Sequence, residues 1–179
     1  MSAAVFPDNT VLCNFAAVQR LDLLEGALRG RGRWTEAVAD EVTRSAAFLP
    51  DLATISIRGW LGEAIEIDDE IAIARIEHLR VDVFGGTVSA PLKHLGEAQT
   101  CYLLKEDPGW AGAWWVSDDR DALEFARRQG ITTRETVDLV AGLVADRELT
   151  ARQAMELLRA MVAAGRVLRL PASVGELQR

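Results

Sequence analysis

The sequence predicts an α/β fold in which helices cover both faces of a central, mostly parallel sheet. Short apolar runs, such as residues 3–6 and 113–116, alternate along the chain with segments in which apolar residues recur at helical spacing. Strands that alternate with helices favour a parallel sheet with both faces covered. The 179 residues allow one domain, and a hydrophobic content of 49% supplies its core.

The first half of the chain combines strand and helix signals with one irregular insertion. Strands are expected at residues 3–6 and 34–38, and helices at residues 11–28, at the residues that lead to Phe48, and at residues 71–79 behind Asp68 and Asp69. A break is expected near Gln19. The β-branched run over residues 55–67 predicts an extended or hairpin-like insertion.

The second half continues the alternation. Helices are expected at residues 95–104 and from Asp121 to Gly130, with a buried central strand at residues 113–116 and a very short strand at Ile131. Two further helices follow. Thr132 with Glu135, and Thr150 with Gln153, have the spacing of a capping box at the start of each.

Charge and composition exclude several classes of protein. The formal net charge of −7 argues against a general nucleic-acid coat protein, although it does not exclude a nuclease. We expect a cytoplasmic protein without a signal peptide, and no apolar run approaches the roughly 18 residues of a membrane span. Cys13 and Cys101 lie in apolar stretches without metal-like spacing, which favours buried thiols.

Four carboxylates stand where an apolar run ends or a helix begins: Asp8, Glu41, Glu97 and Asp119. In an open α/β sheet, the ends of the strands and the starts of the adjoining helices meet at one crevice. Carboxylates that meet there repel one another, and a divalent cation bound by oxygen ligands removes the repulsion. The sequence therefore predicts a Mg²⁺ or Mn²⁺ site, although each acid alone could be a helix cap or an exposed residue of a first helical turn.

The order of these segments resembles the PIN-domain family, in particular the single-domain, VapC-like type found among bacterial toxin components. The resemblance covers roughly residues 3 to 165 and rests on the segments Asp8-Asn9-Thr10-Val11-Leu12, Val38-Ala39-Asp40-Glu41, Leu95-Gly96-Glu97-Ala98 and Val116-Ser117-Asp118-Asp119-Arg120, followed by Ala126 to Ile131. It implies a three-layer α/β/α sandwich and a Mg²⁺- or Mn²⁺-dependent ribonuclease. We accordingly divide the chain into a nuclease domain at residues 1–165 and a short tail at 166–179.

The resemblance also implies a site. Its acidic ring consists of Asp8, Glu41, Glu97 and Asp119, of which Asp8, Glu97 and Asp119 bind the metal. The family's Thr-x-Asp spacing, met by Ser117, selects Asp119, with Asp118 and Asp121 as alternatives. Thr10 stands where the family usually has Asn, and its hydroxyl, like that of Ser117, suits a hydrogen-bonding role beside the ligands.

Other residue types have weaker functional readings. Arg29, Arg31, Arg33 and Arg120 are candidates for RNA contact, against a solvated turn for the first three and a surface salt bridge for Arg120. His78 and His94 are interpreted as surface or helix-flank residues because their spacing offers no catalytic pairing. Trp114 and Trp115 are expected in the core of a covered sheet rather than in base stacking.

The resulting functional prediction is a metal-dependent endoribonuclease, the toxin component of a toxin–antitoxin pair. The resemblance implies an RNA substrate, a cognate antitoxin and a homodimer as partners. The alternative is a catalytically weak PIN-like module that binds nucleic acid or protein. A phosphoacceptor like the response regulators is a third possibility, but it would need a lysine near the acids, and neither Lys93 nor Lys105 lies at a strand end.

Overall fold

The sheet is small and parallel, as predicted. A computed structural model describes residues 3–178, and its sheet has the order β1-β2-β3, with β1 at Val5–Pro7, β2 at Trp114–Val116 and β3 at Thr132–Arg134. Val5 pairs with Trp114, and Trp114 pairs in turn with Thr132. The central strand β2 thus joins the start of the chain to its second half. The α/β class with a parallel sheet flanked by helices is confirmed.

Helices make up most of the molecule. The described residues form the α-helices α1 (Asn9–Ala17), α2 (Leu21–Leu28), α3 (Glu36–Ser45), α4 (Ala53–Arg58), α5 (Glu70–His78), α6 (Leu95–Glu106), α7 (Arg120–Arg128), α8 (Thr136–Ala145) and α9 (Ala151–Ala163). A π-helical turn, η2, follows α5 at Leu79–Val83, and short 3-10 turns lie at Pro50–Leu52, Pro108–Trp110 and Val174–Gln178.

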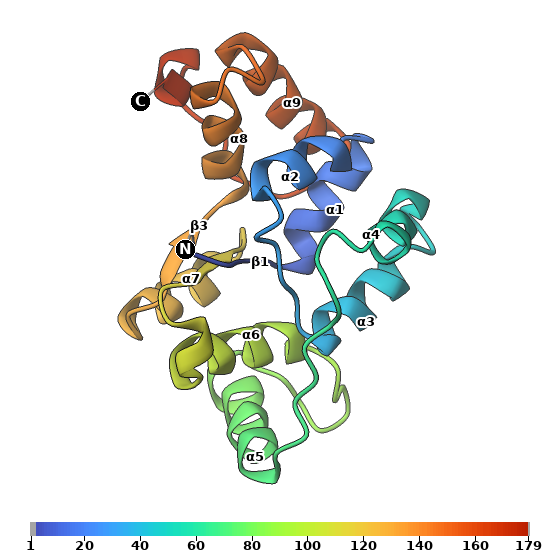
Figure 1. Ribbon diagram of the computed structural model, residues 1–179, viewed down its shortest axis with the longest axis vertical. Coiled ribbons are helices and arrows are strands. Elements are labelled where there is room, and N and C mark those ends of the chain that lie inside the picture. The colour runs from blue at the N-terminus through green and yellow to red at the C-terminus, as the bar shows by residue number, and fades with distance from the viewer. Residues whose placement is uncertain (1–2, 179) are drawn as a thin grey trace.

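The two faces of the sheet have separate cores, because successive strand residues point to opposite faces. Val5 and Val116 belong to the larger core, which they share with apolar residues of α1, α2, α8 and α9. Phe6 and Trp115 are buried in smaller clusters with residues of α6 and α7. Figure 1 shows the same division, with α1, α2, α8 and α9 on one side of the strands and α5 and α6 on the other.

The first predicted helix breaks where expected. Gln19 has a positive φ of 55° between α1 and α2, and α2 ends at Arg29, which is also left-handed. The strand predicted at residues 34–38 is wrong, because α3 begins there. The Thr35 side chain caps α3 by accepting a hydrogen bond from the Val38 amide at 3.4 Å. A short apolar run does not distinguish a strand from the first turn of a capped helix.

The insertion over residues 55–67 is only partly extended. Its first residues belong to α4, which buries Ile55 and ends at the left-handed Gly59. After this turn the chain is extended, and the Ile65 amide donates to the Trp34 carbonyl at 3.0 Å. The prediction was wrong for the first residues because one buried isoleucine held in the core outweighs the strand propensity of β-branched residues.

One of the two predicted capping boxes is confirmed. The Thr150 hydroxyl accepts from the Gln153 amide at 3.2 Å, and the Gln153 side chain accepts in return from the Thr150 amide at 2.9 Å. Thr132 instead belongs to β3, one residue after the strand start expected at Ile131. The cap of α8 lies further along the chain, where Asp138 accepts from the Glu135 amide at 2.8 Å. The remaining helix predictions, at α5, α6 and α7, are confirmed.

The residues after α9 return to the body of the protein. The Arg166 guanidinium donates to the Asn14 side chain at 3.0 Å, and the turn at Val174–Gln178 packs against α8 and α9. Cys13 and Cys101 are buried free thiols, as predicted. Within residues 3–178, no helix is long and apolar enough to cross a membrane.

Candidate active site

Asp8 lies at the carboxyl end of β1 and begins helix α1. Its side chain is 4% exposed and accepts hydrogen bonds from the Asn9 amide at 2.7 Å, the Thr10 hydroxyl at 2.9 Å and the Ser117 hydroxyl at 3.1 Å. The hydroxyl roles predicted for Thr10 and Ser117 match these contacts. Asp8 is therefore a helix cap and also the centre of a polar network between two strand ends.

Ser117 connects Asp8 with Asp119. While its hydroxyl donates to Asp8, it accepts from the Asp119 amide at 3.2 Å. Asp119 in turn caps α7, because its Oδ1 accepts from the Ala122 amide at 3.0 Å. The Oδ2 atom of Asp119 has no hydrogen-bond partner among residues 3–178. One buried serine thus fixes the positions of two carboxylates that are far apart in sequence.

Glu97 lies in the first turn of α6 and contacts a histidine that sequence reasoning left without a role. His94 precedes the helix with a positive φ of 63°, and its Nδ1 lies 3.2 Å from Oε1 of Glu97. His94 does flank the helix, as predicted, but it also restrains the carboxylate. His94 lies outside the helix in a left-handed conformation, so its spacing from Glu97 gave no signal of this pair.

Glu41 on α3 approaches the start of α6 at a glycine. A Cβ atom on Gly96 would lie 2.9 Å from Oε1 of Glu41 and 3.1 Å from Cγ2 of Val38. A side chain at this position would therefore displace the Glu41 carboxylate and press on Val38, and glycine avoids both contacts. Gly96 is a second residue without a predicted role, although it stands inside the motif that identified Glu97.

The carboxylates influence one another electrostatically. Burial raises the pKa of Asp8 to about 7, and the negative charge of Glu97 adds to this effect, against hydrogen bonds from Thr10 and Ser117 that lower the pKa. Burial also raises the pKa of Glu41 to about 8, and the charges of Asp8 and Glu97 contribute further. Such raised values mean that the ionised forms repel one another in a poorly solvated place.

The donor set suits a hard divalent cation, since Mg²⁺ and Mn²⁺ prefer carboxylate oxygens and water. Over the described residues 3–178, however, no group of three or more His, Cys, Asp or Glu side chains is arranged so that it could hold a metal ion. Mg²⁺ commonly keeps several waters and binds through only one or two carboxylates. The residues therefore fit a hydrated ion better than a closed cage of protein ligands.

A cleft of about 310 Å³ opens beside two of these acids. Glu97 and Asp119 both line it, together with His94 and with Asp121, one of the predicted alternatives. The other residues that line the cleft are Val83, Phe84, Gly85, Ala122 and Phe125, which are apolar. The acidic crevice thus continues into a partly aromatic hollow.

Asp118 has a different environment from its neighbour Asp119. Its oxygens accept from the Asn14 amide group at 2.7 Å, and from the Thr136 amide and hydroxyl at 3.0 and 2.6 Å. These contacts join α1 and the start of α8, and Asp118 does not line the cleft. Burial raises its pKa, and the hydrogen bonds from Thr136 oppose the increase. Asp118 serves the packing of three elements.

The candidate RNA-binding arginines are not brought to the acids. Arg29 pairs with Asp146 at 2.5 Å, and Arg33 donates to the carbonyls of Gly30 and Gly32. The Arg31 guanidinium lies 5.8 Å from the ring centroid of Trp114, which is half-buried rather than fully buried as predicted. Arg120, by contrast, follows Asp119 at the start of α7 and is exposed. RNA contact by these residues stays a prediction.

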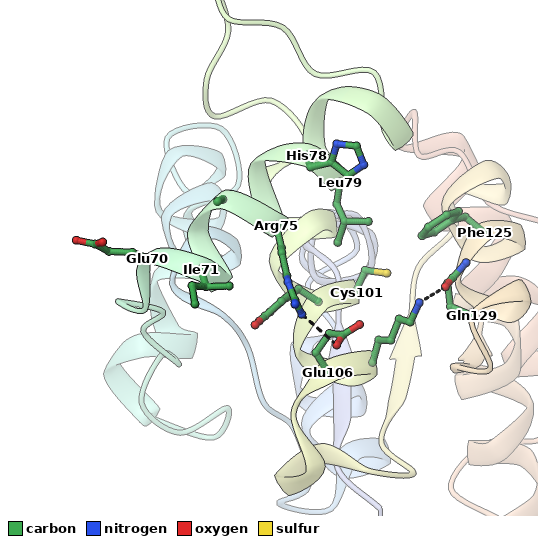
Figure 2. Close-up of a pocket in the computed structure, with 12 residues that line it drawn as sticks. Glu70, Ile71, Arg75, His78, Leu79, Cys101, Glu106, Phe125 and Gln129 are labelled. Atoms are coloured by element: carbon green, nitrogen blue, oxygen red, sulfur yellow. Dashed lines mark hydrogen bonds and ion pairs between the residues drawn. The ribbon is translucent and has the colours of Figure 1, made fainter.

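A larger cavity lies elsewhere. It measures about 670 Å³ between α5, α6 and α7, and apolar side chains such as Ile71, Leu79 and Phe125 line it (Figure 2). At its rim Arg75 contacts Glu106 at 3.4 Å. None of the four predicted acids lines this cavity, and Phe125 is the residue that it shares with the acidic cleft. Volume alone therefore does not identify the site.

Comparison with known proteins gives one match. The model of the DUF3368 family, described as a PIN domain, matches residues 4–174, which is nearly the whole chain. No curated protein and no solved structure matches the sequence.

Proposed function

Because the chain belongs to the PIN-domain family, whose members are commonly nucleases, we propose that it is a metal-dependent endoribonuclease and the toxin of a toxin–antitoxin pair. The observation that carries the proposal is the crevice in which Asp8 and Glu41 have raised pKa values beside Glu97. A folded chain maintains such repulsion only where the rest of the structure enforces it. Binding of a divalent cation would remove the repulsion.

Asp8, Glu97 and Asp119 would hold the cation, partly through water, with Glu41 completing the acidic ring. A bound Mg²⁺ or Mn²⁺ lowers the pKa of a water molecule and neutralises charge on phosphoryl oxygens. The chain itself supplies the orientation. Ser117 donates to Asp8 and accepts from the Asp119 amide, and these contacts hold both carboxylates toward the crevice.

Two further contacts support the geometry of Glu97 and Glu41. His94 restrains Glu97 from the side of the cleft, at 3.2 Å. Gly96 lets Glu41 approach the first turn of α6 without a steric clash. Residues that orient ligands in this way typically change metal affinity or activity by about 10- to 100-fold when they are replaced. They are positioning residues rather than ligands.

A nuclease assay on mixed-sequence RNA, with and without Mn²⁺, tests the enzymatic proposal. Asp8→Asn, Glu97→Gln and Asp119→Asn should each lower divalent-dependent cleavage at least about 100-fold while the proteins remain folded. Glu124→Gln, which removes an exposed carboxylate on α7, is the matched control and should cleave like the wild type. If the Asp8→Asn protein cleaves RNA as fast as the wild type, the proposal is wrong.

The toxin role needs a separate test in cells. Expression of the chain alone should arrest growth, the Asp119→Asn chain should not, and a co-expressed antitoxin from the neighbouring reading frame should restore growth. We expect that antitoxin to place an arginine among the acids, since a guanidinium can bind a carboxylate through two hydrogen bonds. We also propose that the toxin forms a homodimer. If the wild-type and Asp119→Asn chains, expressed at matched levels, both leave growth unchanged, the toxin role is contradicted.

One observation favours the alternative, a binding module with weak catalysis. Among the residues that the structure describes, no three acidic, cysteine or histidine side chains are arranged to hold a metal ion. For a binding module, we expect the chain to bind RNA without cleaving it in Mn²⁺. Binding and cleavage measured on the same RNA therefore separate the two functions.

A further inference from the structure

The cleft beside the acids has an aromatic side that the metal chemistry does not use. The rings of Phe84 and Phe125 meet edge to face, with centroids 5.7 Å apart and planes inclined by 78°. Phe84 also packs edge-on against Trp115 behind it, at 6.4 Å. Both phenylalanines are half-buried and line the same cleft as Glu97 and Asp119. An aromatic hollow and a pair of carboxylates therefore share one opening.

The wall that carries Phe84 is held in place by a buried arginine. Arg80, 1% exposed, donates to the carbonyls of Thr87, Ala90 and Lys93 at 3.1 to 3.4 Å, and its guanidinium is paired with Glu77. The Arg80 carbonyl accepts from the Gly86 amide at 2.8 Å. These bonds hold residues 80–93, which include Phe84, in one conformation. The hollow is preformed, which reduces the ordering cost of binding.

We propose that this cleft binds one nucleobase of single-stranded RNA, stacked against Phe84, beside the phosphate that the acidic ring handles. The inference rests on the proposed nuclease function and names the part of its substrate that the site recognises. Proteins recognise single-stranded RNA largely by stacking splayed-out bases on aromatic side chains, and a base inside a duplex is not available for this. His94 and Asp121, at the polar side of the cleft, offer hydrogen-bonding groups to the edge of the base.

The larger cavity between α5, α6 and α7 is a poorer place for this base. Its lining includes Ile71, Leu79 and Cys101 but none of the four acids of the proposed site. A base seated there would have no phosphate-handling groups in the same opening. Because Ile71 lines only the larger cavity, its replacement distinguishes the two locations.

The test compares adenosine 5′-monophosphate with ribose 5-phosphate, which lacks the base, in the presence of Mg²⁺, which is diamagnetic and leaves the NMR signals near the site observable. Titrations followed by NMR should show that the wild-type protein binds the nucleotide roughly tenfold more tightly, as expected for one stacked base. Phe84→Leu should abolish this preference, Phe84→Tyr should keep it, and Ile71→Ala should leave it unchanged. Contacts between base protons and the Phe84 ring should appear as nuclear Overhauser effects in the wild type, which removes dependence on any variant's folding.

The outcomes separate this inference from the nuclease proposal. Equal affinity for the two ligands, or a preference that survives in a folded Phe84→Leu protein, overturns the base subsite even if RNA is cleaved. A preference lost in Ile71→Ala but kept in Phe84→Leu overturns it as well, because the base then lies in the larger cavity. If the base contacts Phe84 but the protein cleaves no RNA, the base subsite is supported and the proposed nuclease function is contradicted.

Discussion

Asp118, which follows β2, and Asp8, which follows β1, show how differently one fold can use an acidic side chain near a strand end. Asp118 accepts hydrogen bonds from Asn14 and Thr136, and its one like-charged neighbour, Glu135, affects its pKa less than the bonds from Thr136 do. Asp8 also accepts several hydrogen bonds, but it faces Glu41 and Glu97. The number of hydrogen bonds does not distinguish the two residues. The charge of the surroundings does: Asp118 has a structural role, whereas Asp8 lies among like charges and is the acid that we propose binds a metal ion.

The largest effect on stability should come from the structural acid. In Asp118→Ala, the Thr136 amide and hydroxyl lose their acceptor, and the Asn14 side chain loses one of its two acceptors. Unsatisfied buried donors cost roughly 1–3 kcal/mol each, so we expect a loss of about 3–4 kcal/mol in the free energy of unfolding. Urea denaturation measures it, with the exposed Asp121→Ala as control. A loss below about 1 kcal/mol would contradict the structural assignment.

Asp8 should behave in the opposite way, and its effect should depend on pH. Its pKa is about 7 in the folded protein and near 4 when unfolded, so the folded state binds the extra proton between these values. Stability from this group therefore falls as pH rises from about 4 to about 7, and Glu41 extends the fall to about pH 8. Between pH 5 and pH 8, the wild type should lose roughly 2–3 kcal/mol relative to Asp8→Asn. If the difference in the free energy of unfolding between the wild type and Asp8→Asn is the same at both pH values, the raised pKa of Asp8 is refuted.

A divalent cation should offset part of this loss of stability. Mn²⁺ at tenfold excess over its dissociation constant should stabilise the wild type by about 1.4 kcal/mol, because it binds the folded state only. Thermal unfolding with and without Mn²⁺ measures the shift, and Mg²⁺ serves as the second ion. The Glu97→Gln protein should show a much smaller shift, whereas Asp118→Asn, if folded, should respond like the wild type. Equal shifts in the wild type and Glu97→Gln would place the ion elsewhere.

The smallest effect concerns two glycines within helices. In α6, an alanine at Gly96 would bring its Cβ to 2.9 Å from Glu41, so Gly96→Ala should lower activity and cost about 1 kcal/mol or more despite its better helix propensity. In α8, Gly142 has open space where an added methyl group would lie, and Gly142→Ala should stabilise the protein by up to about 1 kcal/mol. Denaturation should show a loss of stability in Gly96→Ala and a gain in Gly142→Ala, and cleavage assays should show lower activity in Gly96→Ala. Equal effects of the two replacements would contradict a role for the close approach of Glu41.

The sequence predicted the parallel sheet and most helices because alternating apolar runs and cap residues act locally. The break near Gln19, the start of α5 at Asp69 and the cap at Thr150 all follow from such local signals. Residues 34–38 were assigned to a strand because the run is too short to show its period. The candidate acids were found through their order along the chain. Which of them meet depends on distant contacts, such as that between Ser117 and Asp8.

What escaped prediction depends on tertiary packing. His94 contacts Glu97 only because its left-handed backbone begins α6 in that direction, and nothing in its neighbours announces this conformation. Gly96 matters through the approach of another helix, which a single sequence does not display. The ion pair between Arg29 and Asp146 likewise joins residues that are far apart in sequence, while RNA contact by the arginines at residues 29–33 stays a prediction. Charge and spacing in the sequence indicate which contacts a side chain can make, and tertiary packing determines which of them it makes.

The bond between Ser117 and Asp8 spans 109 positions of the sequence. It therefore orders events during synthesis on the ribosome. Strand β1 emerges early but meets β2 only after Trp114 to Val116 have been made, and Asp119 becomes part of the crevice later still. A nascent chain that ends before these residues has Asp8, Glu41 and Glu97 but lacks Ser117 and Asp119. The acidic crevice is thus assembled late, when most of the polypeptide already exists.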